Sequence, residues 1–266
     1  MLYLNDEFSK TWQGQDPFKL VQAIEGKIYR EVKNRKTLQF SLDGRSYFLK
    51  MHFGVGWAEI FKNILQLRLP ITSAENEWNA VNRLHDLSID TMTVVAYGKR
   101  GLSPAALQSF IITEDLHNTV SLEEFCARWP DQTPAFAVKS GLIYKVARAA
   151  RAMHTNGICH RDFYICHFLL HKGGDGEFIN LKSRLSLIDL HRALIKENLG
   201  SRWIEKDIAG LYFSCMEIGL TQRDLFRFMC TYKGKGLRET LEEDAQFWKQ
   251  VTLKATALYE KLNRHQ

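Results

Sequence analysis

Alternating apolar and polar positions dominate the first third of the chain. Residues 27–52 read KIYREVKNRKTLQFSLDGRSYFLKMH and are rich in β-branched and aromatic side chains. Asp43-Gly44 interrupts this stretch, and an Asp-Gly pair between two alternating runs is a strong signal of a tight hairpin. The pattern therefore predicts three antiparallel strands, at about 27–33, 37–42 and 45–51.

Helical spacing of apolar residues follows these strands. A first helix is predicted at about 57–69, and Pro70 ends it. A second helix is predicted over AENEWNAVNRLHDL, with apolar residues spaced three or four apart at Trp78, Val81, Leu84 and Leu87. Two further strands, MTVVAYG and QSFIITEDL, are predicted at 92–98 and 108–116.

From about residue 121 the pattern becomes mainly helical. One predicted helix ends at Gly157 and carries an apolar stripe of Leu142, Val146, Ala149 and Met153. Two short strands, FLLHK and RLSLIDL, interrupt the helices, and the chain beyond about residue 203 again predicts helix. This order predicts an α+β protein of two lobes with a cleft between them. The N-lobe, 1–116, has a five-stranded antiparallel sheet with helices, and the C-lobe, 117–266, is mainly helical.

Composition adds three expectations. The 266 residues contain no apolar run of the roughly 18 to 20 residues that a membrane span needs, so we expect a cytoplasmic protein. Five cysteines at irregular spacing indicate reduced thiols. The net charge of +6 lies mostly in the second half: residues 1–115 hold 14 basic and 13 acidic side chains, whereas residues 116–266 hold 22 and 17. An anionic partner is favoured, but the basic residues are scattered, so nucleic-acid binding is not expected.

Several residues meet the needs of phosphoryl transfer, in chain order. This reaction needs a cation for the phosphates, carboxylates for a metal ion, and a carboxylate that orients the attacking hydroxyl. Lys50 lies near the end of the third predicted strand. Asp162 ends the motif His160-Arg161-Asp162, and Asp189 ends the apolar strand SLID. These motifs resemble the catalytic and metal-binding loops of protein kinases.

The second predicted helix offers two acidic partners for Lys50. Glu77 is preferred, because Val81 and Leu84 recur behind it and would seat the helix. Glu75 points about 160° away from Glu77 around the helix, so only one of the two can face Lys50.

The resemblance to a known family covers nearly the whole chain. It is carried by GKIYREVKNRKTLQF, YFLKMH, SAENEWNAVNRLHDL, CHRDFYICHFLL and SLIDLHRA. These stretches resemble the bacterial lipopolysaccharide kinase family, which includes the inner-core heptose kinases and the Kdo kinases. The resemblance implies a protein-kinase-like fold and an ATP-dependent kinase acting on the first heptose of the inner core, at the cytoplasmic face of the inner membrane. A lipopolysaccharide core precursor is then the partner.

The resemblance also implies a role for each candidate residue. Lys50 would bind the ATP phosphates with Glu77 as its partner, and Asp189 would bind Mg²⁺. Asp162 would accept the proton of the sugar hydroxyl. Around adenine, Thr113 would be the gatekeeper, with the carbonyl of Glu114 and the amide of Leu116 as ligands. The residues expected to support the catalytic loop are His160, Arg161 and Asp207. From its position alone, Asp207 could equally be the N-cap of a helix.

The chain departs from the kinase pattern in its first turn. Lys33-Asn34-Arg35-Lys36 stands where a glycine-rich loop would cover the phosphates. The side chain of Arg35 could contact the phosphates instead, and a solvated basic turn is an equally good interpretation.

Further departures surround Asp162. Tyr164 and Cys166 replace the lysine of Ser/Thr kinases and the arginine of many tyrosine kinases. His167 replaces the asparagine that would bind a second metal ion and is the second candidate metal ligand, although imidazole is a poor ligand for Mg²⁺. Only 18 positions separate Asp189 from Asp207, which favours a sugar over a peptide acceptor.

Other interpretations stay open at this point. The acceptor could be Kdo, heptose II or a protein hydroxyl, including this chain's own tyrosines. A catalytically inactive kinase fold could act as a binding module. The predicted helix at 57–69 could lie on the inner membrane or pack on the N-lobe. A zinc site is a minor alternative, built from Cys159, His160, Cys166, His167 and His171.

Overall fold

The computed structural model describes residues 1–32, 35–54, 73–101, 103, 106–173 and 183–264. The predicted helix at 57–69 and Asn34 lie outside the described residues. The chain forms two compact units, of which the first comprises Met1–Asn82 and Met92–Leu116. The second comprises Arg83–Thr91 and His117–Gln266, so residues 83–91 do not group with the predicted N-lobe. The cleft between lobes stays a prediction.

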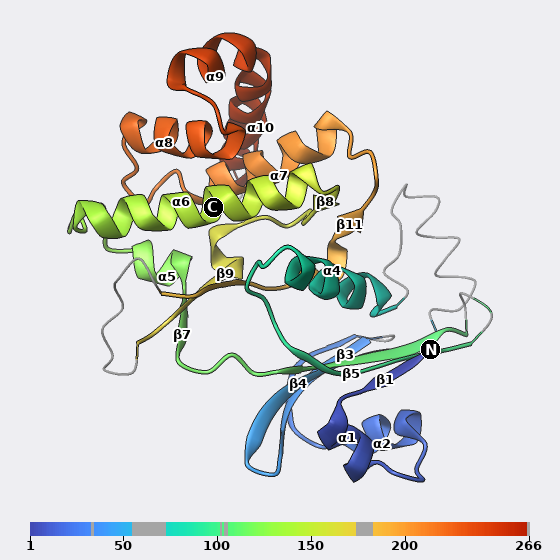
Figure 1. The fold of residues 1–266 in the computed structure, drawn as a ribbon. Helices are drawn as coiled ribbons and strands as arrows, with labels where there is room; N and C mark the ends of the chain where they lie inside the picture. The colour runs from blue at the N-terminus through green and yellow to red at the C-terminus, as the bar shows by residue number, and fades with distance from the viewer. Residues whose placement is uncertain (33–34, 55–72, 102, 104–105, 174–182, 265–266) are drawn as a thin grey trace. The chain divides into compact units, whose positions relative to one another are not determined.

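An antiparallel sheet organises the first unit (Figure 1). Its strands follow the order β1-β5-β6-β4-β3-β2. Its strands are β1 Leu2–Leu4, β2 Lys27–Val32, β3 Arg35–Leu42, β4 Arg45–His52, β5 Val94–Arg100 and β6 Gln108–Glu114. The described sheet has six strands rather than the predicted five. The additional strand, β1, has only three residues and pairs with β5 through Leu2 and Gly98, which is too short a run to show alternation.

The hairpin between β3 and β4 forms where the Asp-Gly pair predicts it. Asp43 and Gly44 both have positive φ, 47° and 76°. Two consecutive residues with positive φ form a type I′ turn, whose twist matches that of the flanking strands. The hairpin register pairs Thr37 with Lys50, which fixes the face of the sheet on which Lys50 lies.

The two faces of this sheet carry different helices (Figure 1). On one face α1 Asp6–Thr11 and α2 Pro17–Ala23 cover a buried cluster that includes Phe8, Leu49 and Met51. On the other face lies α4 Glu75–Asp86, where Trp78 stacks on Tyr97 with ring centroids 4.9 Å apart. Because successive side chains of a strand alternate between faces, Lys50 points to the α4 side while its neighbours fill the core.

The second unit is mainly helical. Its helices are α5 Leu122–Cys126, α6 Phe136–Thr155, α7 Ser201–Ser214, α8 Gln222–Lys233, α9 Leu237–Glu243 and α10 Ala245–Asn263 (Figure 1). The short strands β7 Thr119–Ser121, β9 Phe168–His171 and β10 Leu185–Leu187 form one sheet, and β8 Ile158–Cys159 pairs with β11 Leu194–Ile195. Among the described residues, no helix is long and apolar enough to span a membrane.

Candidate active site

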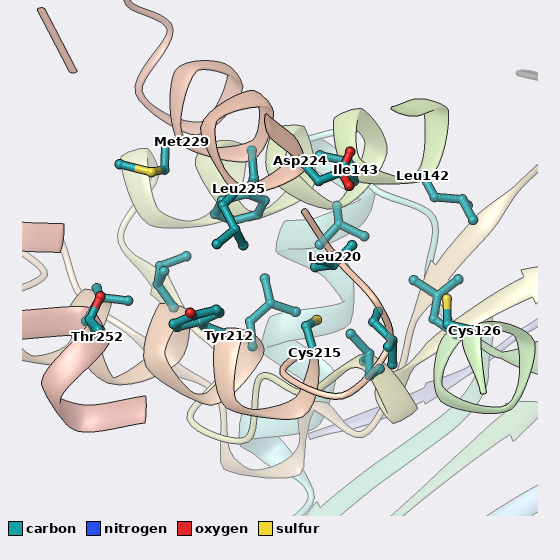
Figure 2. A pocket seen from close by; sticks show the side chains of 18 of the residues that line it. Cys126, Leu142, Ile143, Tyr212, Cys215, Leu220, Asp224, Leu225, Met229 and Thr252 are labelled. Atoms are coloured by element: carbon teal, nitrogen blue, oxygen red, sulfur yellow. The ribbon is translucent and has the colours of Figure 1, made fainter. Parts of the chain in front are cut away.

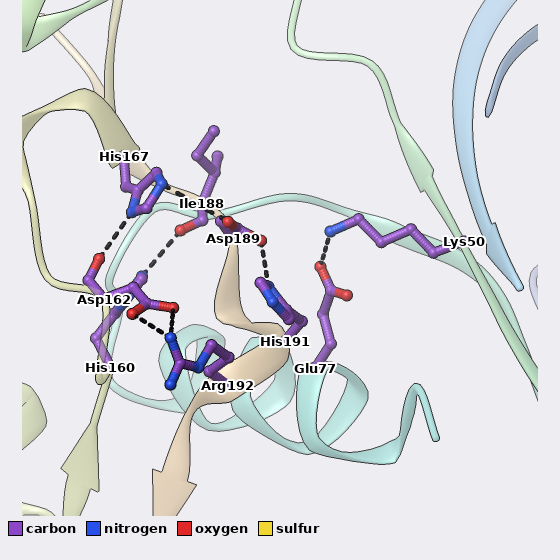
Figure 3. Close-up of polar contacts among 9 residues, drawn as sticks. All are labelled: Lys50, Glu77, His160, Asp162, His167, Ile188, Asp189, His191 and Arg192. Atoms are coloured by element: carbon purple, nitrogen blue, oxygen red, sulfur yellow. Dashed lines mark hydrogen bonds and ion pairs between the residues drawn. The ribbon is translucent and has the colours of Figure 1, made fainter. Parts of the chain in front are cut away.

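Lys50 and Glu77 form a buried ion pair in the first unit (Figure 3). Lys50 Nζ lies 2.6 Å from Glu77 Oε1, and the Glu77 side chain is fully buried. Glu75 points elsewhere and contacts Lys99 Nζ at 2.6 Å. Glu77, the predicted partner of Lys50, is thus the acid that contacts it. Glu75 lies on nearly the opposite side of α4 and pairs with Lys99 instead.

The strand expected to bind adenine is firmly anchored. Thr113 is buried, and Glu114 ends β6 with its N–H donated to the carbonyl of Thr93. The next residue, Asp115, accepts hydrogen bonds from Gln39 Nε2 at 2.7 Å and Ser46 Oγ at 2.8 Å. The first unit ends at Leu116. The adenine-binding roles of Glu114 and Leu116 stay predictions, as does the phosphate-binding role of Arg35, which begins β3.

Asp207 supports the catalytic loop from inside α7. Its carboxylate accepts hydrogen bonds from the backbone N–H groups of His160 at 2.6 Å and Arg161 at 2.8 Å. Arg161 has a φ of 73°, a conformation that costs free energy for a residue other than glycine and persists only where its surroundings fix it. The interpretation of Asp207 as an N-cap is wrong, because α7 begins at Ser201.

The charge of Asp207 is stabilised despite its burial. Burial alone would raise its pKa, but hydrogen bonds from the His154 ring and the Cys159 thiol outweigh this effect and hold the pKa below its usual range. His154 Nε2 lies 3.3 Å from Asp207 Oδ2, and the other ring nitrogen, Nδ1, bonds to the hydroxyl of Tyr232 at 2.8 Å. The carboxylate therefore stays ionised and keeps its acceptor capacity for the loop.

His160 connects the catalytic loop to the strand that precedes Asp189. Its Nε2 donates a hydrogen bond to the carbonyl of Ile188 at 2.9 Å, and burial lowers the pKa of the ring (Figure 3). His160 is thus a neutral side chain that fixes one loop relative to the other, which leaves its Nε2 unsuited to zinc. Among the described residues, no group of three or more His, Cys, Asp or Glu side chains is arranged to hold a metal ion.

Asp189 lies between two histidines. It follows β10 with a φ of 62°, and its Oδ1 contacts Nδ1 of His191. Its Oδ2 lies 3.6 Å from Nε2 of His167. Mg²⁺ in kinases is commonly held by one or two carboxylates together with substrate phosphates, so a partly exposed carboxylate such as Asp189 fits this role.

His167 contacts both Asp162 and Asp189, and these contacts favour the protonated ring. Its Nδ1 donates a hydrogen bond to the carbonyl of Asp162 at 2.7 Å. Burial lowers the pKa of His167, but the hydrogen bonds with Cys166 and with this carbonyl, together with the charge of Asp189, raise it to about 9. An imidazolium has no lone pair for a metal ion. The metal-binding role of His167 stays a prediction that requires the loss of this proton.

Arg192 is the functional candidate that sequence reasoning missed. Its Nη1 lies 2.7 Å from Oδ1 and 3.0 Å from Oδ2 of Asp162 (Figure 3). The signal was present but unused: the loop around Asp162 lacks the cation that protein kinases carry there, and an arginine stands three positions after Asp189. Their proximity depends on strand pairing that the sequence pattern does not reveal.

A second feature that sequence reasoning missed is an apolar cavity of about 310 Å³ within the second unit (Figure 2). It lies among α5, α6, α7, α8 and α10, and its lining includes Leu122, Ile143, Val146, Leu211, Leu225 and Val251. Leu142 and Val146 also line it and belong to the apolar stripe that predicts an ordinary core. These two residues are buried as predicted, but the helices leave a space beside them.

Comparison with known proteins decides the family. The model of the lipopolysaccharide kinase (Kdo/WaaP) family matches residues 19–232. The chain belongs to the lipopolysaccharide kinase family. It is therefore a phosphotransferase with an alcohol group as acceptor, and the family implies the use of ATP with a divalent metal ion.

Relatives within the lipopolysaccharide kinase family match along the full length. Over 264 residues the chain is 47% identical to lipopolysaccharide core heptose(I) kinase WaaP of Escherichia coli, covering 99% of each chain. It is also 47% identical to WaaP of Pseudomonas aeruginosa PAO1, covering 99% of this chain and 98% of the relative. A solved structure of WaaP in complex with acyl carrier protein is 43% identical, with a TM-score of 0.84, and the match covers 97% of this chain and 99% of that one. These similarities confirm the predicted kinase-like α+β fold.

Proposed function

We propose that this kinase transfers the γ-phosphate of ATP to a hydroxyl of heptose I in the lipopolysaccharide inner core. The observation that carries the proposal is the full-length 47% identity to proteins named lipopolysaccharide core heptose(I) kinase. The geometry of the site residues supports it. Lys50 is paired with Glu77, the carboxylate of Asp162 is held by Arg192, and the carboxylate of Asp189 is partly exposed.

Asp162 is the proposed proton acceptor. The loop that carries it is fixed by the two backbone hydrogen bonds to Asp207 and by the ring of His160. Such positioning supplies much of the catalysis of phosphoryl transfer, because the transition state is loose and needs little covalent assistance. Asp162 then orients the sugar hydroxyl and receives its proton as the new oxygen–phosphorus bond forms.

Lys50 and Asp189 are the proposed phosphate and metal contacts. Lys50 would neutralise the phosphates, and Glu77 keeps its ammonium group in one position. Mg²⁺ bound by Asp189 would neutralise charge on the β- and γ-phosphates. The main-chain groups of Glu114 and Leu116 would bind adenine, and Arg35 would contact the phosphates from the start of β3.

The proposed location is the cytoplasmic face of the inner membrane, where ATP and a lipid-anchored core precursor can meet. The excess positive charge of residues 116–266 suits an anionic acceptor. Acceptor binding should then weaken as the salt concentration rises.

We also infer that acyl carrier protein is a partner, which is supported by the solved complex of the 43% identical WaaP with acyl carrier protein. A carrier protein of this kind presents an acyl chain, and the apolar cavity of the second unit offers a lining suited to one. Acylated carrier protein should raise the Tm of the kinase more than the non-acylated form does. Leu225→Trp, which fills the cavity, should abolish this difference. Equal stabilisation by both carrier forms would contradict the role of the cavity.

The acceptor is tested with ATP, Mg²⁺ and three substrates: unphosphorylated heptose-bearing core, Kdo-lipid A and the kinase itself. Transfer to the heptose-bearing core is expected, and Asp162→Asn should abolish it. Transfer only to Kdo-lipid A would identify a Kdo kinase, whereas transfer only to protein would identify a protein kinase. ATP consumption in the wild type that Asp162→Asn abolishes would exclude the binding-module interpretation.

A further inference from the structure

The catalytic loop lacks a cation at the two positions where kinases place one beside the catalytic aspartate. Tyr164 and Cys166 occupy the two positions where kinases carry a lysine or an arginine near the catalytic aspartate. Tyr164 packs against Phe213 of α7, with ring centroids 6.3 Å apart. Arg161 lies over the ring of Trp203 at 5.3 Å. The carboxylate of Asp162 therefore receives no positive charge from Tyr164, Cys166 or Arg161.

Strand pairing brings an arginine from a different segment to this carboxylate. β8 pairs antiparallel with β11 so that Cys159 lies opposite Leu194. If the same antiparallel register continues past this pair, the residues just after Cys159 lie beside the residues just before Leu194. Asp162 and Arg192 thus meet although they are far apart in the sequence.

A single turn of 3-10 helix aims Arg192 at Asp162. The turn comprises Leu190–Arg192 and begins after Asp189. Leu190 is fully buried and anchors the turn, while His191 contacts Asp189 and Arg192 contacts Asp162. Two successive side chains of the turn therefore serve the two carboxylates of the site.

Both Arg192 and Asp162 keep hydrogen-bonding groups that their mutual contact does not use. Arg192 uses only Nη1 for the two oxygens of Asp162. Within the described part of the chain, no other hydrogen bond of this guanidinium is seen, so Nε and Nη2 keep their donors. Each carboxylate oxygen also keeps a lone pair, because a carboxylate offers about four acceptor sites. Arg192 thus holds Asp162 without blocking it.

We propose that Arg192 is a catalytic residue that binds the phosphoryl group during transfer, in place of the cation missing at positions 164 and 166. This inference rests on the kinase activity proposed above. A guanidinium can contact a carboxylate and a phosphoryl oxygen at once, because its donors form a planar fork. A purely structural role is disfavoured, since the Arg192 side chain is 38% exposed and exposed ion pairs contribute little to stability.

Bonds, electrons and protons balance in this transfer. The acceptor hydroxyl oxygen attacks the γ-phosphorus, and the bond between this phosphorus and the β,γ-bridging oxygen breaks, so the bonding electrons leave with ADP. The hydroxyl proton passes to the carboxylate of Asp162. Arg192 stays protonated throughout, and its positive charge reduces the repulsion between that carboxylate and the oxygens of the phosphoryl group.

The test compares Arg192→Met and Arg192→Lys with the wild type under ATP and Mg²⁺ saturation. Arg192→Met should lower kcat by about 10²- to 10³-fold, the range typical for loss of one transition-state donor. The KM for ATP should change by less than about threefold, because the contact forms with the phosphoryl group in transit. Arg192→Lys should restore part of kcat, since it returns the charge without the fork. Arg184→Met, which removes an exposed arginine paired with Asp90, is the matched control and should match the wild type.

A second measurement separates phosphoryl binding from an effect on folding or on Asp162 alone. The affinity for MgADP with fluoroaluminate, a mimic of the phosphoryl group in transit, should fall at least about 30-fold in Arg192→Met, whereas the affinity for MgADP should not. The proposal is overturned if kcat of Arg192→Met stays within about threefold of the wild type, or if both affinities are unchanged. The kinetic test uses whichever acceptor the wild type phosphorylates. A wrong acceptor therefore shows in the wild-type arm, and a wrong role for Arg192 shows only in the variants.

Discussion

The ion pair of Lys50 and Glu77 in the first unit and the loops that carry Asp162 and Asp189 in the second unit are built in different ways. Lys50 and Glu77 project from a regular strand and a regular helix, and one ion pair joins them. Asp162 and Asp189 lie in irregular loops that contain residues with positive φ. Regular elements position a side chain by their periodicity, whereas irregular loops require additional polar contacts to hold one conformation.

The difference also concerns how each site responds to a change. In the first unit the ion pair holds Glu77 against Lys50, so a change in either partner should act through Lys50. The loops of the second unit share Asp207, His160 and Arg192 as common supports. A change in one support should therefore disturb several functional groups together.

The largest expected effect belongs to Asp162→Asn. An amide cannot accept the hydroxyl proton, so kcat should fall by about 10³-fold, within the range for loss of a general base. The variant should keep its Tm within a few degrees, because the loop is held mainly by Asp207. Steady-state kinetics and thermal unfolding measure the two quantities. Retention of more than a tenth of the wild-type kcat would remove Asp162 from its proposed role.

Asp207→Asn should lower stability and activity together. An amide group facing two buried backbone N–H donors can accept from only one, and each unsatisfied buried donor costs about 1–3 kcal/mol. The free energy of unfolding should fall by about 2–4 kcal/mol in urea titrations. Asp90→Asn, at an exposed pair with Arg184, is the control and should change it by less than about 1 kcal/mol. Equal effects of the two substitutions would contradict the supporting role of Asp207.

The same variant has an expected pH signature. The pKa of Asp207 in the folded state lies below its unfolded value of about 3.9. Its contribution to stability is therefore present above pH ~4 and is lost as the pH falls through the folded-state pKa. The difference in unfolding free energy between the wild type and Asp207→Asn should narrow as the pH drops below ~4. A constant difference across pH 3–7 would show that the charge of Asp207 is not what supports the loop.

A double-mutant cycle tests whether Glu77 acts through Lys50. Lys50→Met should lower kcat/KM for ATP by about 10²-fold, and Glu77→Gln by about 10-fold, because the second change removes the orienting charge but leaves the lysine. The double variant should match Lys50→Met, since Glu77 acts through Lys50. Additive losses would mean that Glu77 has a separate function.

The smallest effect is expected at Glu75. Its pair with Lys99 is partly exposed, so Glu75→Gln should change the free energy of unfolding by less than about 1 kcal/mol. Its kcat/KM should stay within about twofold of the wild type. This variant is the matched control for Glu77→Gln, because both carboxylates belong to the first turn of α4. A tenfold loss of kcat/KM in Glu75→Gln would show that contact with Lys50 is not what distinguishes Glu77 from Glu75.

Sequence reasoning succeeded where periodicity determines position. The Asp-Gly hairpin and the spacing of Val81 and Leu84 fixed the faces on which Lys50 and Glu77 lie, so their contact was foreseeable. It failed for β1, which is too short to alternate. The alternative interpretation of Asp207 as an N-cap was also wrong, because Asp207 lies inside α7. The contact of Arg192 with Asp162 depends on a long-range register that no local pattern encodes.

The cavity of the second unit was missed for a related reason. Apolar stripes reveal which side of a helix is buried but not how closely the facing helices approach. The stripe that includes Leu142 and Val146 is consistent with a filled core and with a space large enough for a ligand. Only the distances between helices distinguish the two.

The pairing of β8 with β11 has a consequence for how such enzymes are recognised. Because backbone pairing brings the two segments together, a positive charge on either one would lie near the aspartate. If Arg192 has the role proposed above, a search that reads only the segment around Asp162 would classify this chain as lacking the cation. A search that scores positions 164, 166 and 192 jointly would separate active lineages from those that have lost the charge altogether.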